Sequence, residues 1–205
     1  MLSPIKFIGI YLLLLLSVVS AKGQENITIS SEYGPKSAEL LDYYQFEKID
    51  YFRMRMQGNT LAGKKFLIIS KEYWNSKVTK TDTCVNSGRM GIKADTSDFS
   101  FAVMSKKENK DTVKFMFFFP RFMTTRQFKA TQVNSYSLRD PFNGKKCEYN
   151  ADQTIMLLVL SLPYKDPKNP GWSSYCELSS KGVPPAEWGT KYGVEHYITF
   201  ELKLE

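Results

Sequence analysis

Apolar and polar residues alternate along most of the chain after its first two dozen positions. The clearest case is the segment 194–204, where Val194, His196 and every second residue up to Leu204 share one face. The segments 51–57 and 99–103 repeat this pattern. A period of two residues is typical of a strand with one buried face and one wet face. We therefore predict half-buried strands in all three segments.

Three further segments are apolar on both faces, namely 66–69, 115–119 and 155–160. Strands of this kind lie inside a sheet that is covered on both sides. We expect these segments at the centre of the fold, under a second sheet or a helix.

Turn and helix signals complete the expected architecture. Polar turns at 106–111 and 74–77 predict two hairpins. Ser37 is a suitable N-cap for a helix that starts at Ala38, and Pro185 favours a second, very short helix. We predict a mainly β domain (all-β to α+β), in which about eight to ten antiparallel strands form a sandwich or a barrel-like sheet with one or two short helices. The pattern leaves the choice between sandwich and barrel open.

The N-terminal pattern is different. A basic start precedes an apolar run at 7–19, which ends in small residues up to Ala21. This is the pattern of a secretory signal peptide, with cleavage after Ala21 or after Gly23. The run is shorter than the about 20 apolar residues of a membrane-spanning helix. We expect residues 1–21 to be removed and residues 22–205 to form one soluble domain, periplasmic or secreted, without a transmembrane anchor.

The formal net charge is +7, which raises the question of an anionic partner. Many lysines, such as Lys106, Lys107 and Lys110, fall in turns and at strand ends, where solvated charge is normal. A phosphate-binding surface would have a denser set of cations and a recognisable motif. We therefore expect no nucleic-acid partner, and we retain weak attraction to anionic glycans or to an anionic membrane surface.

The irregular stretch 165–185 is the first place to look for a binding site, because Pro and Gly interrupt it repeatedly. Large aromatic residues lie in it and just after it: Trp172, Tyr175, Trp188 and Tyr192. Such rings stack on a sugar or another flat ligand, or they fold back over the sheet as a lid. We name these four as candidate ligand-binding residues. The expected ligand is a glycan, a peptide or a component of the cell envelope.

The chain has three cysteines, an odd number for a protein expected in an oxidising compartment. Cys147 and Cys176 flank the apolar segment 153–162, and we expect them to form a disulfide worth about 3 to 4 kcal/mol. Cys84 would stay unpaired, and three reduced thiols are the alternative. No two Cys or His residues have the close spacing of zinc ligands. We expect neither a metal nor another cofactor.

Catalytic groups are scarce. His196 is the sole histidine, and the alternation places it on an apolar face, as is typical of a hydrogen-bonded core residue. Cys176 with His196 would be a nucleophile and base of the thiol protease type. A pair of carboxylates is the other route, as in glycoside hydrolysis. The acidic residues nearest the aromatic loop are Glu148, Asp152, Asp166, Glu187 and Glu195.

These observations favour a non-catalytic binding or envelope-associated module. A small extracytoplasmic hydrolase is the alternative. Asn26 and Thr112 each lie in a short glycosylation-acceptor pattern, which is too short to assign a compartment.

Overall fold

The computed structural model describes residues 26–165, 173–175 and 182–205. Its elements, in chain order, are β1 (Asn26–Tyr33), α2 (Ala38–Phe46), β2 (Ile49–Gln57), β3 (Phe66–Trp74), β4 (Lys77–Asn86), β5 (Asp98–Lys107), β6 (Thr112–Phe118), β7 (Met123–Lys129), β8 (Ser137–Arg139), β9 (Cys147–Asn150), β10 (Ile155–Ser161), β11 (Tyr164–Lys165), β12 (Ser173–Ser174), η1 (Pro185–Glu187), α4 (Trp188–Tyr192) and β13 (His196–Leu204).

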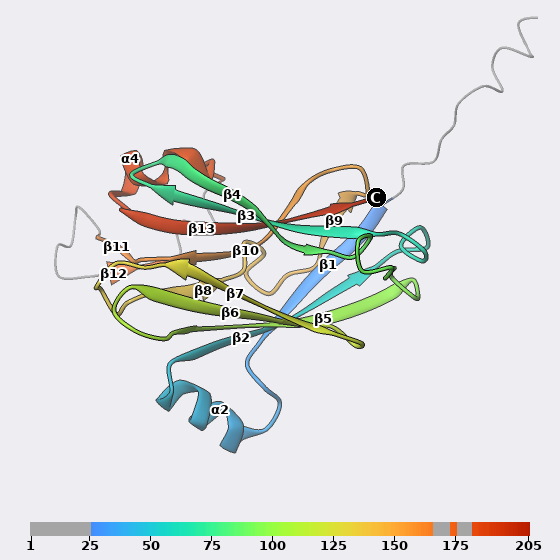
Figure 1. Ribbon diagram of the computed structural model, residues 1–205, viewed down its shortest axis with the longest axis horizontal. Helices are drawn as coiled ribbons and strands as arrows, with labels where there is room; N and C mark the ends of the chain where they lie inside the picture. Colours follow the sequence, from blue (N-terminus) through green and yellow to red (C-terminus); the bar gives the residue numbers. More distant parts are fainter. Residues whose placement is uncertain (1–25, 166–172, 176–181) are drawn as a thin grey trace, which may run out of the picture.

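Two antiparallel sheets form the body of the molecule. One has six strands in the order β7-β6-β5-β2-β1-β9, and the other has five in the order β4-β3-β13-β10-β8. Figure 1 shows them as two layers facing each other. The predicted antiparallel β fold is confirmed, and two separate sheets make it a sandwich. The strands are slightly more numerous than expected because β8 and β9 are too short to show a period.

The main core lies between the two sheets. Ile198, Phe200 and Leu202 of β13 face inward and are completely buried, as their alternation predicts. The Phe200 ring contacts that of Phe115 in β6, with centroids 4.6 Å apart. The core therefore joins the C-terminal strand to the opposite sheet.

A smaller core covers the outer face of the five-stranded sheet. Trp188 of α4 packs on Tyr197 of β13, with ring centroids 5.3 Å apart. Val159 of β10 belongs to the same buried cluster. The prediction that the segment 155–160 is covered on both faces is therefore confirmed.

The same prediction is wrong for the segment 115–119. Met116 and Phe118 of β6 point away from the main core and are half-buried. The outer face of the six-stranded sheet is covered only in part, since α2 packs mainly on β2. Outward-facing residues of β3, such as Leu67 and Ile69, are likewise half-buried.

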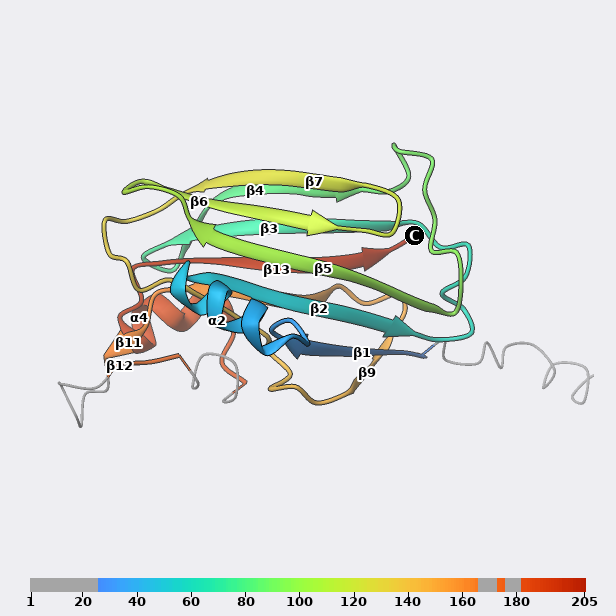
Figure 2. The same cartoon turned by 90° about the horizontal axis from the view of Figure 1, so that it is seen from below.

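The helix α2 begins as predicted, because the Ser37 hydroxyl accepts a hydrogen bond from the Leu40 N–H at 3.2 Å. Figure 2 shows α2 lying over β2 on the outer side of its sheet. Tyr44 contacts Tyr51 of β2, with ring centroids 5.8 Å apart. No residue of α2 is fully buried, and Phe46 is 83% exposed. None of the helices in the described part of the chain has the length and apolar character that a membrane crossing requires.

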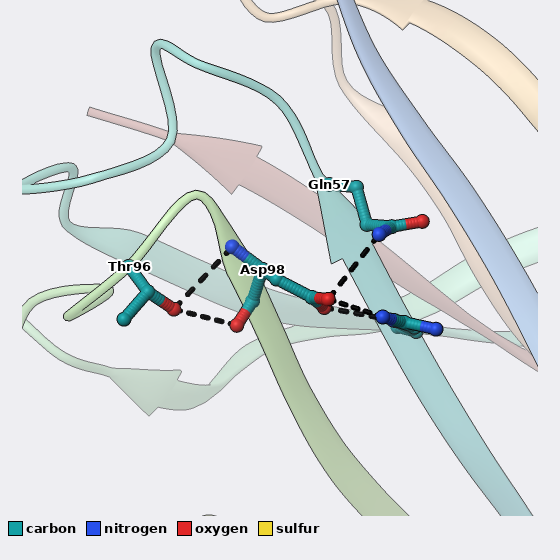
Figure 3. Close-up of polar contacts among 4 residues, drawn as sticks. Gln57, Thr96 and Asp98 are labelled. Carbon is teal, nitrogen blue, oxygen red and sulfur yellow. Dashed lines mark hydrogen bonds and ion pairs between the residues drawn. The ribbon is translucent and has the colours of Figure 1, made fainter.

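A polar cluster on the outer surface ties the end of β2 to the start of β5. Gln57 donates a hydrogen bond to the Asp98 carboxylate at 3.2 Å, and the Thr96 hydroxyl donates to the Asp98 carbonyl at 2.6 Å (Figure 3). Arg55 adds a two-point contact with the same carboxylate, which lowers the pKa of Asp98. The cluster is exposed, so we assign it to strand register rather than to a binding site.

Candidate functional site

Inward-facing polar side chains gather at one end of the sandwich. β2 and β13 begin at this end, while β3 and β5 end there. The end lies opposite the C-terminus (Figure 1). We call the group the polar end layer, and its members are Asp50, Glu72, Ser105, Tyr136 and His196. Glu72, Ser105 and His196 are at most 6% exposed.

His196 is the centre of this layer and has no exposed surface. Its Nδ1 lies 2.5 Å from the Tyr136 hydroxyl oxygen, and its Nε2 lies 3.5 Å from Glu72 Oε1. Because a carboxylate only accepts hydrogen bonds, we place the imidazole proton on Nε2, so that Tyr136 donates to Nδ1. The Trp74 ring packs on the imidazole, with centroids 4.1 Å apart. The sole histidine is therefore a core residue held on three sides.

Glu72 is held by two neighbours. The Trp74 Nε1–H donates to Glu72 Oε1 at 2.7 Å, on the oxygen that also faces His196. Burial acts to raise the pKa of Glu72, but the adjacent His196 imidazole and the hydrogen bond from Trp74 outweigh it, and the pKa lies below its ordinary value. Glu72 is therefore a buried carboxylate that keeps its charge.

Asp50 behaves in the opposite way. Its carboxylate accepts a hydrogen bond from the Leu138 N–H at 2.7 Å and another from the Ser105 hydroxyl. These bonds and the nearby Arg139 lower its pKa, but burial has the larger effect and raises the pKa to about 6. Asp50 therefore takes up a proton in mildly acidic solution.

Three hollows border this end of the sandwich. The central hollow, of about 460 Å³, is lined by Phe46, Glu47, Lys48, Asp50, Ser105, Lys106, Lys107, Glu108, Asn109, Lys110, Val113, Asn134, Tyr136 and Leu160. The aromatic hollow, of about 290 Å³, is lined by Ser31, Tyr33, Phe52, Arg139, Asp140, Asn143, Gly144 and Tyr175. The edge hollow, of about 590 Å³, is lined by Glu72, Trp74, Thr79, Lys80, Gln127, Phe128 and Lys129.

Two of the four lysines that line the central hollow, Lys106 and Lys107, are engaged within the protein. Lys107 Nζ donates to the carbonyls of Thr131 and Val133 at 2.7 and 2.9 Å. Lys106 forms an ion pair with Glu47 at 2.5 Å. These lysines hold the segment before β8 and the end of α2 in place, so a structural role accounts for them.

The aromatic hollow has three ring walls and one cation. The Arg139 guanidinium lies over the Tyr175 ring, 4.8 Å from its centroid. Burial raises the pKa of Tyr175, so that its hydroxyl keeps its proton and donates to the Ser135 carbonyl. Asp140 accepts hydrogen bonds from the Ser31 hydroxyl and the Gly144 N–H. In the described part of the chain, no carboxylate lies within ion-pair distance of Arg139.

The four aromatic residues predicted from the sequence have different positions. Tyr175 lines the aromatic hollow, and its role in binding stays a prediction. Trp188 is 1% exposed and donates from Nε1 to the Val183 carbonyl at 2.8 Å. Tyr192 is half-buried and packs against the same small core. Trp172 lies outside the described residues. The sequence left open whether these rings stack on a ligand or fold back over the sheet. In the structure, the rings of Trp188 and Tyr192 fold back over the sheet.

The groups named for catalysis do not converge on these hollows. His196 is enclosed by Tyr136, Glu72 and Trp74, and Cys176, its candidate partner, lies outside the described residues. Asp166 lies outside them too. The remaining candidates are exposed and line none of the three hollows, namely Glu148, Asp152, Glu187 and Glu195. Among the described residues, no three His, Cys, Asp or Glu side chains are grouped to hold a metal ion.

The described cysteines are Cys84, which is buried, and Cys147, which is half-buried in β9. Neither has a disulfide partner among the described residues. The expected partner of Cys147 is Cys176, which lies outside the described residues, so this disulfide stays a prediction.

A comparison with known protein families, with curated proteins and with solved structures finds no match. The site therefore rests on its geometry. Sequence reasoning missed Asp50, although a signal was present: the inward positions of β2 continue from Asp50 through Phe52 and Met54. A charged residue in register with buried apolar ones marks a polar site in a core. Arg139 carried no such signal, because β8 is too short to show alternation.

Proposed function

We propose that this chain is an exported, non-catalytic binding module whose ligand is an acidic saccharide bound in the aromatic hollow. The observation that carries the proposal is the Arg139 guanidinium over the Tyr175 ring, with Tyr33 and Phe52 in the same lining. The face of a sugar ring packs on aromatic side chains, and a guanidinium binds a carboxylate through two parallel hydrogen bonds.

The size of the hollow supports a small ligand. Its volume of about 290 Å³ is at the lower end of the range for ligand pockets. One acidic sugar unit, at the end of a chain or within it, suits this space better than a long segment. The remaining polar groups of the lining, such as Asn143, are available for sugar hydroxyls.

A binding role suits the acid and base groups better than catalysis does. The Asp140 carboxylate accepts two hydrogen bonds from the protein, and the His196 imidazole is enclosed in the core. Export is proposed on the N-terminal pattern alone, in which a short apolar run ends in small residues. A saccharide of the cell envelope or of the surroundings is the ligand class that such a protein meets.

The test is calorimetric titration of the purified protein with oligosaccharides of galacturonate, glucuronate, mannuronate and sialic acid, each beside a neutral analogue. We expect at least one acidic saccharide to bind and its neutral analogue to bind more weakly. Arg139→Gln and Tyr175→Ala should each reduce the affinity at least about tenfold, because a central contact contributes about 2 kcal/mol or more. Added salt should weaken binding.

Arg121→Gln is the matched control, since Arg121 is an exposed arginine paired with Asp95 away from this hollow. It should bind like the wild type. Lack of binding to every acidic saccharide, or full affinity in Arg139→Gln, would refute the proposal. Mass spectrometry of the same mixtures reveals cleavage products, and their appearance would favour the hydrolase alternative.

A further inference from the structure

The edge hollow lies on the other flank of the sandwich from the aromatic hollow. Its lining comes from β3 and β4 of one sheet and from β7 of the other, and β4 and β7 are the edge strands on that side. The aromatic hollow instead involves β1, β2 and the end of β8. The two hollows are therefore formed by different strands.

The floor of the edge hollow is a fixed acceptor beside an indole. Glu72 is 6% exposed, and its contacts with Trp74 Nε1 and His196 Nε2 are both made by Oε1. The same contacts fix the indole, whose ring packs on His196. Buried charge is costly unless neighbours compensate for it. The carboxylate and the indole are thus positioned before any ligand arrives, which lowers the entropy lost on binding.

The charged residues at the rim of the edge hollow indicate which class of ligand it binds. Lys80 and Lys129 contribute two ammonium groups against the single carboxylate of Glu72, so the lining does not favour a cation. Lys80 is partly neutralised by Asp82 at 3.5 Å, and the carboxylate at the floor opposes an anion. A neutral ligand with many hydroxyls suits both the carboxylate and the ammonium groups, because hydroxyls donate to Glu72 and accept from the lysines.

We propose that the edge hollow is a second saccharide site, specific for a neutral sugar that packs on Trp74 and donates hydroxyl hydrogens to Glu72. The volume of about 590 Å³ accommodates more of a chain than the aromatic hollow does. This inference goes beyond the proposed function, since it concerns a different hollow, different residues and an uncharged ligand.

The experiment uses the ¹⁵N-labelled full protein and reads the indole N–H resonances during titration. The probes are neutral tetrasaccharides built from glucose, galactose, mannose, xylose or N-acetylglucosamine. We expect at least one of them to shift the Trp74 resonance, assigned through Trp74→Phe. The Trp188 resonance is an internal control, because that indole is buried and bonded to Val183. It should stay in place.

Variants then locate the site. Glu72→Gln should weaken binding of the active tetrasaccharide at least tenfold, while Glu201→Gln, which removes a carboxylate from the neighbouring strand β13, should leave it unchanged. Lys129→Ala alters only an exposed rim residue, so its fold should be intact. It should also weaken binding of the tetrasaccharide, and it decides the test if Glu72→Gln fails to fold.

Arg139→Gln should not affect this binding, which separates the inference from the acidic-saccharide proposal. The inference is wrong if no neutral tetrasaccharide shifts the Trp74 resonance, or if binding survives both Glu72→Gln and Lys129→Ala. Acidic saccharides that displace every neutral one from Trp74 would also overturn it.

Discussion

Asp50 and Glu72 are two inward-facing carboxylates at the same end of the sandwich, and their pKa values shift in opposite directions. At Glu72 the nearby His196 imidazole and the Trp74 donor outweigh burial, and at Asp50 burial outweighs its donors. The balance between burial and hydrogen bonding at each residue, rather than the residue type, sets which carboxylate takes up a proton near pH 6.

This difference predicts a pH-dependent stability. The pKa of Asp50 rises from 3.8 to about 6 on folding, so between these values the folded state binds more protons than the unfolded chain. Its contribution to the free energy of unfolding therefore falls as the pH rises through this window, by about 2 to 3 kcal/mol in total. Asp50→Asn keeps an acceptor for the Leu138 N–H and removes the charge.

We expect Asp50→Asn to be more stable than the wild type at pH 7 by up to about 2 to 3 kcal/mol, and equally stable near pH 4. Urea denaturation at both pH values measures this difference. Asp152→Asn, at an exposed position, is the control for the removal of one charge by the same substitution. A stability difference that is the same at pH 4 and pH 7 would contradict the assignment.

At the scale of elements, β13 has the largest consequence for stability, since it joins β3 and β10 in the middle of its sheet. Phe200 has no exposed surface and contacts Phe115 and Phe128 of the opposite sheet. Phe200→Ala should cost about 3 to 5 kcal/mol, because it removes apolar contacts and leaves a cavity.

Its neighbour Glu201 lies on the other face of the same strand and is half-buried, with an ion pair to Lys71 at 2.9 Å. Glu201→Ala should therefore lower the free energy of unfolding by at most about 1 kcal/mol. This loss is slightly larger than that expected for substitution of a fully solvated side chain. Denaturant midpoints of the two variants check the face assignment. Equal losses at both positions would mean that the alternation does not reflect burial.

The elements that sequence reasoning found share one property, which is that a local pattern specifies them. The hairpins around 74–77 and 106–111, the N-cap at Ser37 and the short helix after Pro184 all follow from neighbouring residues. β8 and β9 were missed because three or four residues cannot display a period. The prediction that β6 is covered on both faces was wrong, because the cover of its outer face depends on where α2 packs.

At the scale of the whole molecule, the redox state of the cysteines is testable. A disulfide between Cys147 and Cys176 would leave Cys84 as the sole thiol, and burial raises the pKa of that thiol. We expect no rapidly reacting thiol in the folded, unreduced protein and one after unfolding. In Cys84→Ala, the number of thiols detected after unfolding should fall to zero. Three thiols in the unfolded wild type would exclude the disulfide.

Processing is the second test at this scale. If the N-terminal segment is a signal peptide, exported protein starts at Lys22 or Gln24. N-terminal sequencing of protein recovered outside the cytoplasm identifies the cut. Recovery of intact Met1 from a membrane fraction would contradict export as a processed protein.

The β class, the antiparallel hairpins and the buried face of β13 are all predictable from the order of residues, because alternation with a period of two residues is a local property. Which polar groups meet depends instead on long-range packing, and the three-dimensional fold was needed to identify them. Asp50, Glu72, Ser105 and His196 come from distant parts of the chain and converge because four strands begin or end at one end of the sandwich, and Tyr136, just before β8, joins them there. The fold also decided that Trp188 is a core residue, since the direction in which a ring folds depends on the long-range surface available to bury it.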